Sequence, residues 1–262
     1  MRLSFKPTPN LEIGLSRTAQ WAGSGRPSDA DSFFRLLIGE DNADGGASKA
    51  DEPGNQLAGY DVRYSFAGFN LPLAIYGQFI GEDEAGGLPA KFLGLVGIEG
   101  WIGANALFDG DLRWRLEYVD TTANFQESDP LENTTYEHST YRSGYRYYRR
   151  SLGHSLDNDS RMITLGFVYN SGAHVDYELV LRSGEFNRDG GVGPGRVPGG
   201  DNLVPGNTRS PVQADFYGAD WTAIWRVTDT TKLDVGLSYL RTESDTEVDS
   251  DLMPYVEWSQ AF

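Results

Sequence analysis

Most of this chain is made of stretches in which apolar and polar residues alternate. In the stretch 232–241, Leu233, Val235, Leu237 and Tyr239 fall on one side of an extended backbone, and charged or small residues fall on the other. Successive side chains of a β-strand point to opposite faces, so this alternation predicts a strand with one apolar and one polar face. The polar face carries charges, which is typical of a strand in an outer-membrane barrel.

The same alternation recurs along the chain between turn-forming residues, and it predicts eleven strands. They are Arg2–Pro7, Leu11–Trp21, Leu57–Phe66, Leu71–Glu82, Lys91–Ile102, Leu112–Tyr118, Arg161–Asn170, Val175–Arg182, Asp215–Val227, Lys232–Arg241 and Leu252–Phe262. One short segment, Ala30–Ile38, has helical spacing of its apolar residues, and we expect it to fold over the mouth of a barrel. The chain is therefore predicted to be all-β.

The connections between these strands alternate between short and long. The short ones are 228–230, 170–172, 104–110, 67–70 and 8–10, and the long ones are 242–251, 184–214, 126–160, 83–90 and 22–56. Outer-membrane barrels have short periplasmic turns and longer extracellular loops, whereas a soluble sandwich has no reason to alternate in this way. We predict an antiparallel transmembrane β-barrel of outer-membrane type, with its long loops facing the cell exterior.

The last predicted strand supports the barrel interpretation. Leu252, Val256, Trp258 and Phe262 share one face, and the chain ends on an aromatic residue, as outer-membrane barrels do. The amino-terminal segment, in contrast, lacks the apolar core of a secretory signal. An odd number of strands does not close a bacterial barrel of the usual even-numbered kind. We therefore expect residues 1–262 to form a single partial barrel domain whose first strands and signal peptide are missing.

Composition agrees with a barrel and excludes several other classes. The chain has a net charge of -16 and no cysteine, and no segment approaches the roughly 20 apolar residues of a spanning helix. A barrel needs only one apolar face per strand, so a mean hydropathy of -0.45 does not oppose it. The acidity argues against a nucleic-acid partner. The lack of cysteine excludes a disulfide scaffold and Cys-ligated zinc.

Segment 136–160 concentrates arginine and tyrosine in an otherwise acidic chain. Guanidinium groups bind carboxylates in a bidentate manner, and tyrosine rings stack on sugars while their hydroxyl groups form hydrogen bonds, so the mixture suits an acidic polysaccharide. The candidate binding residues are Tyr136, Tyr141, Arg142, Tyr145, Arg146, Tyr147, Tyr148, Arg149 and Arg150. The alternative is that these side chains pair with acidic residues of the protein and fold the loop.

This segment also resembles a known family. The sequences Tyr136-Glu137-His138 and 144–160, together with Leu11 to Arg17, are similar to the Wzi-type capsule-assembly outer-membrane proteins. The resemblance implies an 18-stranded barrel with a periplasmic helical bundle, of which this chain would hold the carboxy-terminal strands. It also implies a non-enzymatic surface lectin that attaches capsular polysaccharide to the cell, with a lumen too obstructed for an open pore.

The expected surroundings and partners follow from this interpretation. They are acidic capsular polysaccharide, outer-membrane lipid and lipopolysaccharide, and the barrel-insertion machinery during assembly. The full-length protein is expected to be a monomer.

A diffusion channel is the alternative function. The residues predicted to face the lumen carry both signs of charge, which would create a transverse field for solutes in an open barrel. They are Asp61, Arg63, Arg113, Arg115, Glu117, Asp220, Arg226 and Asp234. Interior charge is equally what a closed barrel would use for salt bridges that fill its lumen.

No catalytic, metal or cofactor site is expected. His138, His154 and His174 lack the spacing of a metal site or a catalytic triad. Segment 157–159 (Asp-Asn-Asp) offers oxygen ligands for calcium, but its spacing is not that of an EF-hand, and we expect an Asx-type turn at the start of a strand instead. Segment 190–206 is rich in glycine but has no phosphate-binding Gly-Lys-Ser/Thr sequence.

Overall fold

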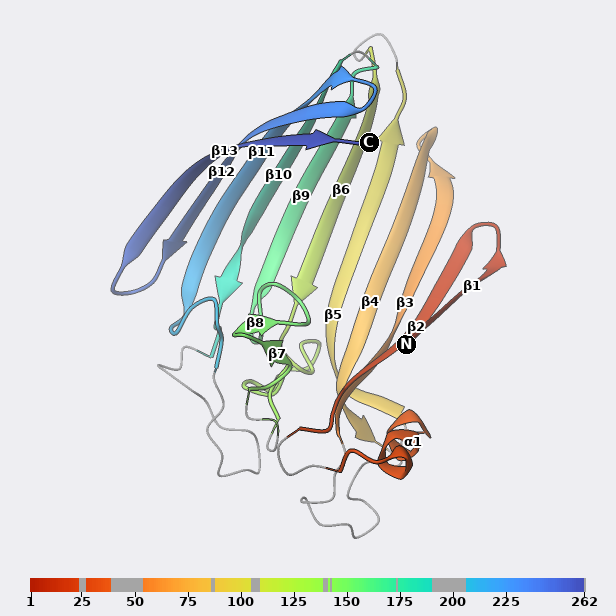
Figure 1. Ribbon diagram of the computed structural model, residues 1–262, viewed down its shortest axis with the longest axis vertical. Helices are drawn as coiled ribbons and strands as arrows, with labels where there is room; N and C mark the ends of the chain where they lie inside the picture. Colours follow the sequence, from red (N-terminus) through yellow and green to blue (C-terminus); the bar gives the residue numbers. More distant parts are fainter. Residues whose placement is uncertain are drawn as a thin grey trace.

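A computed structural model describes the chain except residues 24–26, 39–53, 86–87, 105–108, 139–140, 142, 173, 190–205 and 262. Figure 1 shows long strands lying side by side in one tall, curved sheet. The sheet strands are β1 (Arg2–Thr8), β2 (Leu11–Trp21), β3 (Gly54–Gly68), β4 (Leu71–Ala85), β5 (Leu88–Ile102), β6 (Asp111–Asp120), β9 (Arg161–Asn170), β10 (Val175–Phe186), β11 (Ala214–Thr228), β12 (Thr231–Glu243) and β13 (Val248–Gln260). The described part of the chain also holds helix α1 (Ala30–Ile38) and two short strands, β7 (Arg146–Tyr147) and β8 (Arg150–Ser151).

The order of the strands in the sheet follows their order in the chain. Each of the eleven strands pairs antiparallel with its sequence neighbour, and β6 pairs with β9 because β7 and β8 form a separate hairpin. β1 and β13 lie at the two ends of this order. The predicted all-β, antiparallel architecture is confirmed, and so is the helix at Ala30–Ile38. The carboxy-terminal Phe262 lies outside the described residues.

Two of the predicted long loops are wrong. Residues 83–85 continue β4 and pair with residues 88–90, which begin β5. The segment 242–251 belongs largely to β12 and β13, which are joined by a turn at Ser244 to Glu247. Both segments are rich in acidic residues. Polar side chains do not prevent strand pairing where a strand extends beyond its apolar residues, because the backbone groups can still form hydrogen bonds. Charge therefore marks the end of the apolar belt and not the end of the strand.

One face of the sheet, here called the outer face, carries an apolar belt. The cross-strand partners Ile75, Ile98, Leu116, Leu165 and Leu181 form an unbroken apolar row over five strands, β4, β5, β6, β9 and β10. The side chains Ile75, Leu116 and Leu181 remain exposed. A continuous exposed apolar row is unfavourable in water and suits contact with lipid acyl chains. None of the helices in the described residues has the length and hydropathy of a membrane crossing.

The opposite face, here called the inner face, carries ion pairs along much of its height. Glu99 is almost fully buried between Arg63 and Arg113, with each N–O distance at 2.6 Å, and both guanidinium groups lie over the ring of Trp101. Further pairs on this face are Arg2–Asp61, Lys6–Glu12, Arg115–Glu117, Arg182–Asp220 and Arg226–Asp176. The predicted inward charges are therefore mostly engaged with one another.

The two ends of the sheet differ. One end, here called the turn end, has the short connections that precede β2, β4, β6, β10 and β12. The other, the loop end, gathers α1, β7 and β8, at the bottom of Figure 1. Near the loop end the inner face is apolar, since Val119, Phe186 and Phe216 pack around Leu156 of the β6–β9 connection. This connection, residues 121–160, is here called the plug.

Candidate functional site in the plug

A polar clasp joins the two ends of the plug. The amide of Thr121 donates to the carbonyl of Ser160 at 2.8 Å, and the amide of Ser160 donates to the hydroxyl of Thr121 at 3.0 Å. Both residues are fully buried. The adjacent residues of β6 and β9 are paired with each other, so the clasp closes the plug into a compact lobe, residues 121–160, that is joined to the sheet only through this narrow neck. The lobe can then fold on itself without disturbing the register of the sheet.

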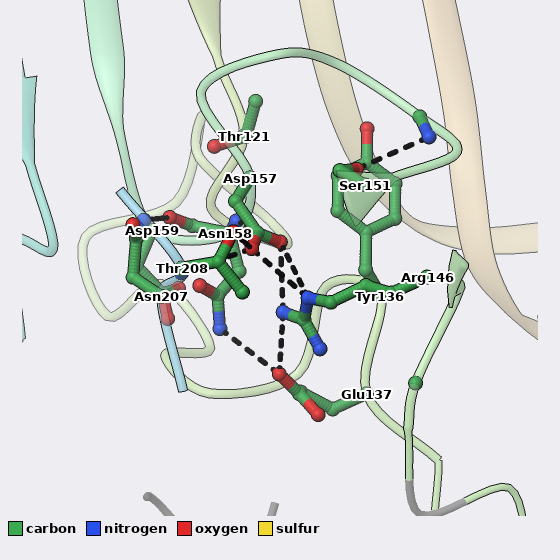
Figure 2. Close-up of polar contacts among 12 residues, drawn as sticks. Thr121, Tyr136, Glu137, Arg146, Ser151, Asp157, Asn158, Asp159, Asn207 and Thr208 are labelled. Atoms are coloured by element: carbon green, nitrogen blue, oxygen red, sulfur yellow. Dashed lines mark hydrogen bonds and ion pairs between the residues drawn. The ribbon is translucent and has the colours of Figure 1, made fainter. Parts of the chain in front are cut away.

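Arg146 forms the centre of the lobe. Its Nη2 lies 2.7 Å from Asp157 Oδ1 and 2.7 Å from Glu137 Oε1, and its Nε donates to both oxygens of Asp157. The three side chains are at most 2% exposed. Figure 2 shows Arg146 reaching between the two carboxylates. A buried guanidinium with this set of acceptors is satisfied electrostatically, but removing one partner would leave an unpaired buried charge.

A second connection completes this network. The amide and hydroxyl of Thr208 donate to Asp157, and the side-chain amide of Asn207 donates to the Leu156 carbonyl and the Ser160 hydroxyl. Figure 2 shows Thr208 and Asn207 beside the segment 157–159. This segment is fully buried, and its Asn158 amide donates to Asp157 at 3.1 Å. The β10–β11 connection therefore fastens the plug from the side opposite Arg146.

Burial perturbs two carboxyl groups of the plug. Desolvation raises the pKa of Glu137 to about 7, while its hydrogen bond from Arg146 opposes the rise. Desolvation also raises the pKa of Asp159 to about 7, helped by the nearby charges of Asp189 and Glu132. The hydrogen bond that Asp159 accepts from the Asn133 amide at 2.9 Å opposes that rise. Both groups favour the protonated form more strongly than they would in water.

Tyr136 is buried in the plug and packs between its turns at residues 144–145 and 153–154. Its hydroxyl accepts a hydrogen bond from the His154 amide at 2.9 Å, and its carbonyl accepts one from Tyr145 at 2.7 Å. Gly153 lies against the Tyr136 ring so closely that a Cβ would approach a ring carbon to 2.3 Å. Gly144 has a φ of +67°, and a Cβ there would collide with the Tyr136 carbonyl. Both glycines are required by close approach to Tyr136.

The β7–β8 hairpin projects from this buried base. Tyr147 pairs with Arg150, so Tyr148 and Arg149 form a two-residue turn, with φ angles of 48° and 64°. Positive φ at both central residues is the geometry of a type I′ turn, which glycine and asparagine adopt most easily. Tyr147 and Tyr148 are 66% and 84% exposed, with their rings 4.6 Å apart, and Arg149 and Arg150 are also exposed. The tip is therefore strained, and its large side chains face solvent.

The nine candidate binding residues thus separate into groups. Tyr136 and Arg146 are buried and follow the alternative in which the side chains fold the loop. Tyr141 and Tyr145 are half-buried, and Arg142 lies outside the described residues. The remaining four, Tyr147, Tyr148, Arg149 and Arg150, lie together on the hairpin tip.

Asn207 and Thr208 belong to the buried network but were not among the sequence candidates. No local pattern marks them, since the β10–β11 connection meets the plug only in three dimensions. In the segment 157–159, the backbone amide of Asn158 donates to the carboxylate of Asp157, the residue directly before it, so the predicted Asx-type turn, which spans two residues, stays a prediction. Among the described residues, no group of three or more His, Asp or Glu side chains is arranged to hold a metal ion. Nearly all of the glycine-rich segment 190–206 lies outside the described residues.

Comparison with known proteins identifies a family and a relative with similar sequences. The family sequence model described as capsule assembly protein Wzi matches residues 1–252. A protein of Klebsiella pneumoniae, described as an uncharacterized 55.8 kDa protein in the cps region, is 40% identical over 124 residues, which cover 47% of this chain and 23% of that protein. This match therefore reaches less than a quarter of the relative.

Solved structures give the fold. The outer-membrane protein Wzi of Escherichia coli, described as a carbohydrate-binding β-barrel involved in group 1 capsule assembly, is similar with a TM-score of 0.72 and 26% identity. The similarity covers 97% of this chain and 51% of the E. coli chain, so this chain spans about half the length of that relative. The predicted barrel fold is confirmed by this match. Since the family sequence model covers nearly the whole chain, the chain belongs to the capsule assembly protein Wzi family.

Proposed function

We propose that this protein is a non-enzymatic lectin of the outer membrane that holds capsular polysaccharide at the cell surface. The observation that carries the proposal is the β7–β8 tip, where Tyr147, Tyr148, Arg149 and Arg150 face solvent together. Family membership supports it, and so does the description of the E. coli relative as a carbohydrate-binding barrel. The loop end would face the cell exterior, as in other outer-membrane barrels.

The tip has the chemistry of an acidic-sugar contact. Tyr147 and Tyr148 offer aromatic faces and hydroxyl groups to sugar rings, and two exposed guanidinium groups next to them can bind carboxylates of the polymer in a bidentate manner. Arg146, one residue before the tip, ties it to Asp157 and Glu137. A preorganised contact loses less entropy on binding than a mobile one. The rigid base thus favours binding by the tip.

The diffusion channel fits the inner face less well. Of the charges that motivated it, Arg63 and Arg113 are paired with Glu99, and Asp61, Arg115, Glu117, Asp220 and Arg226 also have ion-pair partners. Paired charges largely cancel at a distance and produce little transverse field. The plug also packs on the inner face at the loop end. Both features favour a barrel whose lumen is obstructed and which binds a ligand at its surface.

Partition of capsule between cells and medium tests the proposal. The full-length gene is deleted in an encapsulated host and replaced by the wild type or by a variant in which residues 147–150 are all changed to Ala. With the variant, we expect total polymer to be unchanged and most of it to move from the cell pellet to the medium. Loss of two aromatic and two charged contacts should weaken polymer binding at least tenfold.

A matched control is available at the same end of the molecule. Phe34 and Arg35 of α1 are an exposed aromatic residue and an exposed cation, and replacing both with Ala should leave the partition unchanged. If the tip variant retains capsule as well as the wild type, the tip is not the contact. Conductance of the full-length protein in planar bilayers addresses the channel, since large and steady openings would contradict a closed barrel.

A further inference from the structure

A cavity lies between the plug and the inner face of the sheet. Its volume is about 320 Å³, within the range of small-molecule sites. Strands β2 to β6 supply one wall, and Tyr136, Tyr145, Leu152, Gly153 and His154 of the plug supply the other. It is distinct from the hairpin tip, because none of Tyr147 to Arg150 lines it.

The lining divides into an apolar surface and a set of polar groups. Leu57, Leu93, Leu95, Ile80 and Val119 give it an apolar wall, next to the ring of Tyr136. The polar groups come from Ser16 and Thr18 of β2, Gln78 of β4, and Tyr145 and His154 of the plug.

Several of these polar groups are available to a ligand. Within the described part of the chain, the side-chain polar atoms of Ser16, Thr18, Gln78 and Tyr145 have no hydrogen-bond partner. They offer three hydroxyl groups and one amide. A hydroxyl both donates and accepts, and an amide has separate donor and acceptor atoms, so this set can bind several hydroxyl groups of one ligand.

His154 adds a donor of defined geometry. Its Nδ1 accepts a hydrogen bond from the Leu156 amide at 3.3 Å, so in the neutral ring the proton lies on Nε2. Burial lowers the pKa of His154, which keeps the ring neutral near pH 7. Among the described residues, no Asp, Glu, Lys or Arg side chain lines the cavity. Its lining is therefore uncharged, unlike the arginine-bearing tip, and the nearby charge of Glu117 only partly opposes the lowering of the His154 pKa.

An apolar wall with aromatic rings, opposite a cluster of hydroxyl and amide groups, matches a pyranose ring. The ring presents C–H groups on its faces and hydroxyl groups around its edge, and tyrosine is suited to both. An acyl chain would use the apolar wall but would leave four polar side chains unsatisfied, which is costly in a partly enclosed site. The lack of charged groups disfavours a sugar acid, whose carboxylate would be desolvated without a partner.

We infer that this cavity is a binding subsite for a single neutral hexose unit, separate from the tip that contacts acidic units. The inference rests on the proposed lectin function and adds to it: the protein would bind a mixed polymer at two positions of different chemistry. The tip would take charged units, and the cavity would take an uncharged unit or chain end.

Binding of simple sugars to the full-length protein tests the subsite. The protein is held in micelles of an amine oxide detergent, which has no sugar head group. Saturation-transfer NMR is recorded with methyl glucoside, methyl galactoside, methyl mannoside and methyl glucuronoside. We expect at least one neutral hexoside to bind with a millimolar Kd and the glucuronoside to bind at least several-fold more weakly. Ser16→Phe, which fills the cavity, should weaken binding at least tenfold.

Two further variants keep the test independent of misfolding. Leu15→Phe makes the same aromatic change one residue away on the outer face, and it should leave hexoside binding unchanged. Gln78→Leu removes an amide at nearly constant volume, and it should weaken hexoside binding several-fold without strengthening binding of decanoate. Absence of binding by every neutral hexoside, equal binding by the Ser16→Phe protein, or saturable binding of decanoate alone would each overturn the inference.

Failure of the subsite and failure of the proposed function give different results. If the tip variant releases capsule but Ser16→Phe does not alter hexoside binding, the lectin function stands and the subsite is rejected. If deletion of the gene leaves the capsule partition unchanged while a hexoside still binds in the cavity, the subsite remains a sugar site and the capsule-anchoring function is rejected.

Discussion

The base and the tip of the β7–β8 hairpin are made of the same residue types but have opposite environments. Arg146 is 2% exposed and is held by Asp157 and Glu137, whereas Arg149 and Arg150 face solvent. The buried arginine organises the lobe, and the exposed arginines are free to meet a ligand. The difference teaches that, in a run of mixed Arg and Tyr, function follows the environment of each side chain and not the composition of the run.

Replacing Arg146 with Ala should have the largest effect. It leaves Asp157 and Glu137 as buried carboxylates without their cation, and loss of one member of such a group costs about 3–5 kcal/mol. We expect residues 121–160 to lose most of their protection in hydrogen exchange, while the strands keep theirs.

The matched change at the tip sharpens the contrast. Arg149→Ala removes an exposed side chain and should alter plug stability by no more than about 0.5 kcal/mol. Equal loss of protection in the Arg146 and Arg149 variants would mean that the buried ion pairs do not hold the lobe together.

A change of pH should affect the base and not the tip. The pKa of Asp159 in the folded plug is about 7, above the ordinary value of 3.8, so the folded state keeps a proton that the open state loses. Stability of the plug is then highest below about pH 4 and falls as pH rises to about 7, by at most a few kcal/mol. Glu137 changes stability in the same direction between its ordinary value and about 7.

Hydrogen exchange of residues 121–160, corrected for its intrinsic pH dependence, measures this effect. Asp159→Asn keeps the size of the side chain and removes its titration, so it should flatten the pH profile. A profile that is equally steep with and without Asp159 would assign the titration to another group.

A change in stability of the opposite sign is expected at the tip turn, where substitution should be favourable. Replacing Tyr148 with Asn and Arg149 with Gly supplies the residues that a type I′ turn prefers, and relief of two left-handed residues is worth about 1–2 kcal/mol. The hairpin should become more protected in hydrogen exchange, but binding of capsular polysaccharide should weaken. Unchanged binding would show that Tyr148 and Arg149 are not contact residues.

Most of the fold could be predicted from alternation alone. The bounds of β2 and β9 agree with the expected strands, and α1 was expected at Ala30–Ile38. Strand ends were less predictable. β4 extends through the acidic residues Asp83 and Glu84, because pairing depends on the backbone and not on the polarity of the side chains.

The candidate site could be predicted only in part. Local sequence shows that Arg and Tyr are concentrated in 136–150, but it does not show which of them meet a buried carboxylate. Arg146 differs from the exposed arginines because it forms ion pairs with Asp157 and Glu137. Asp157 is in turn held by Thr208, some fifty residues further along the chain. Such pairings depend on how two loops meet above the sheet, which no periodic pattern encodes.

The hydrogen bonds between Thr121 and Ser160 make the plug a structural unit that can vary independently of the sheet. The two ends of the plug meet directly next to the paired ends of β6 and β9. The positions at which the plug joins the sheet therefore stay the same whatever sequence lies between them. Surface loops vary more easily than the elements that they connect. If the plug binds capsular polysaccharide as proposed, its contents can change with the sugars of the capsule while the sheet is kept, provided that the bonds between Thr121 and Ser160 are preserved.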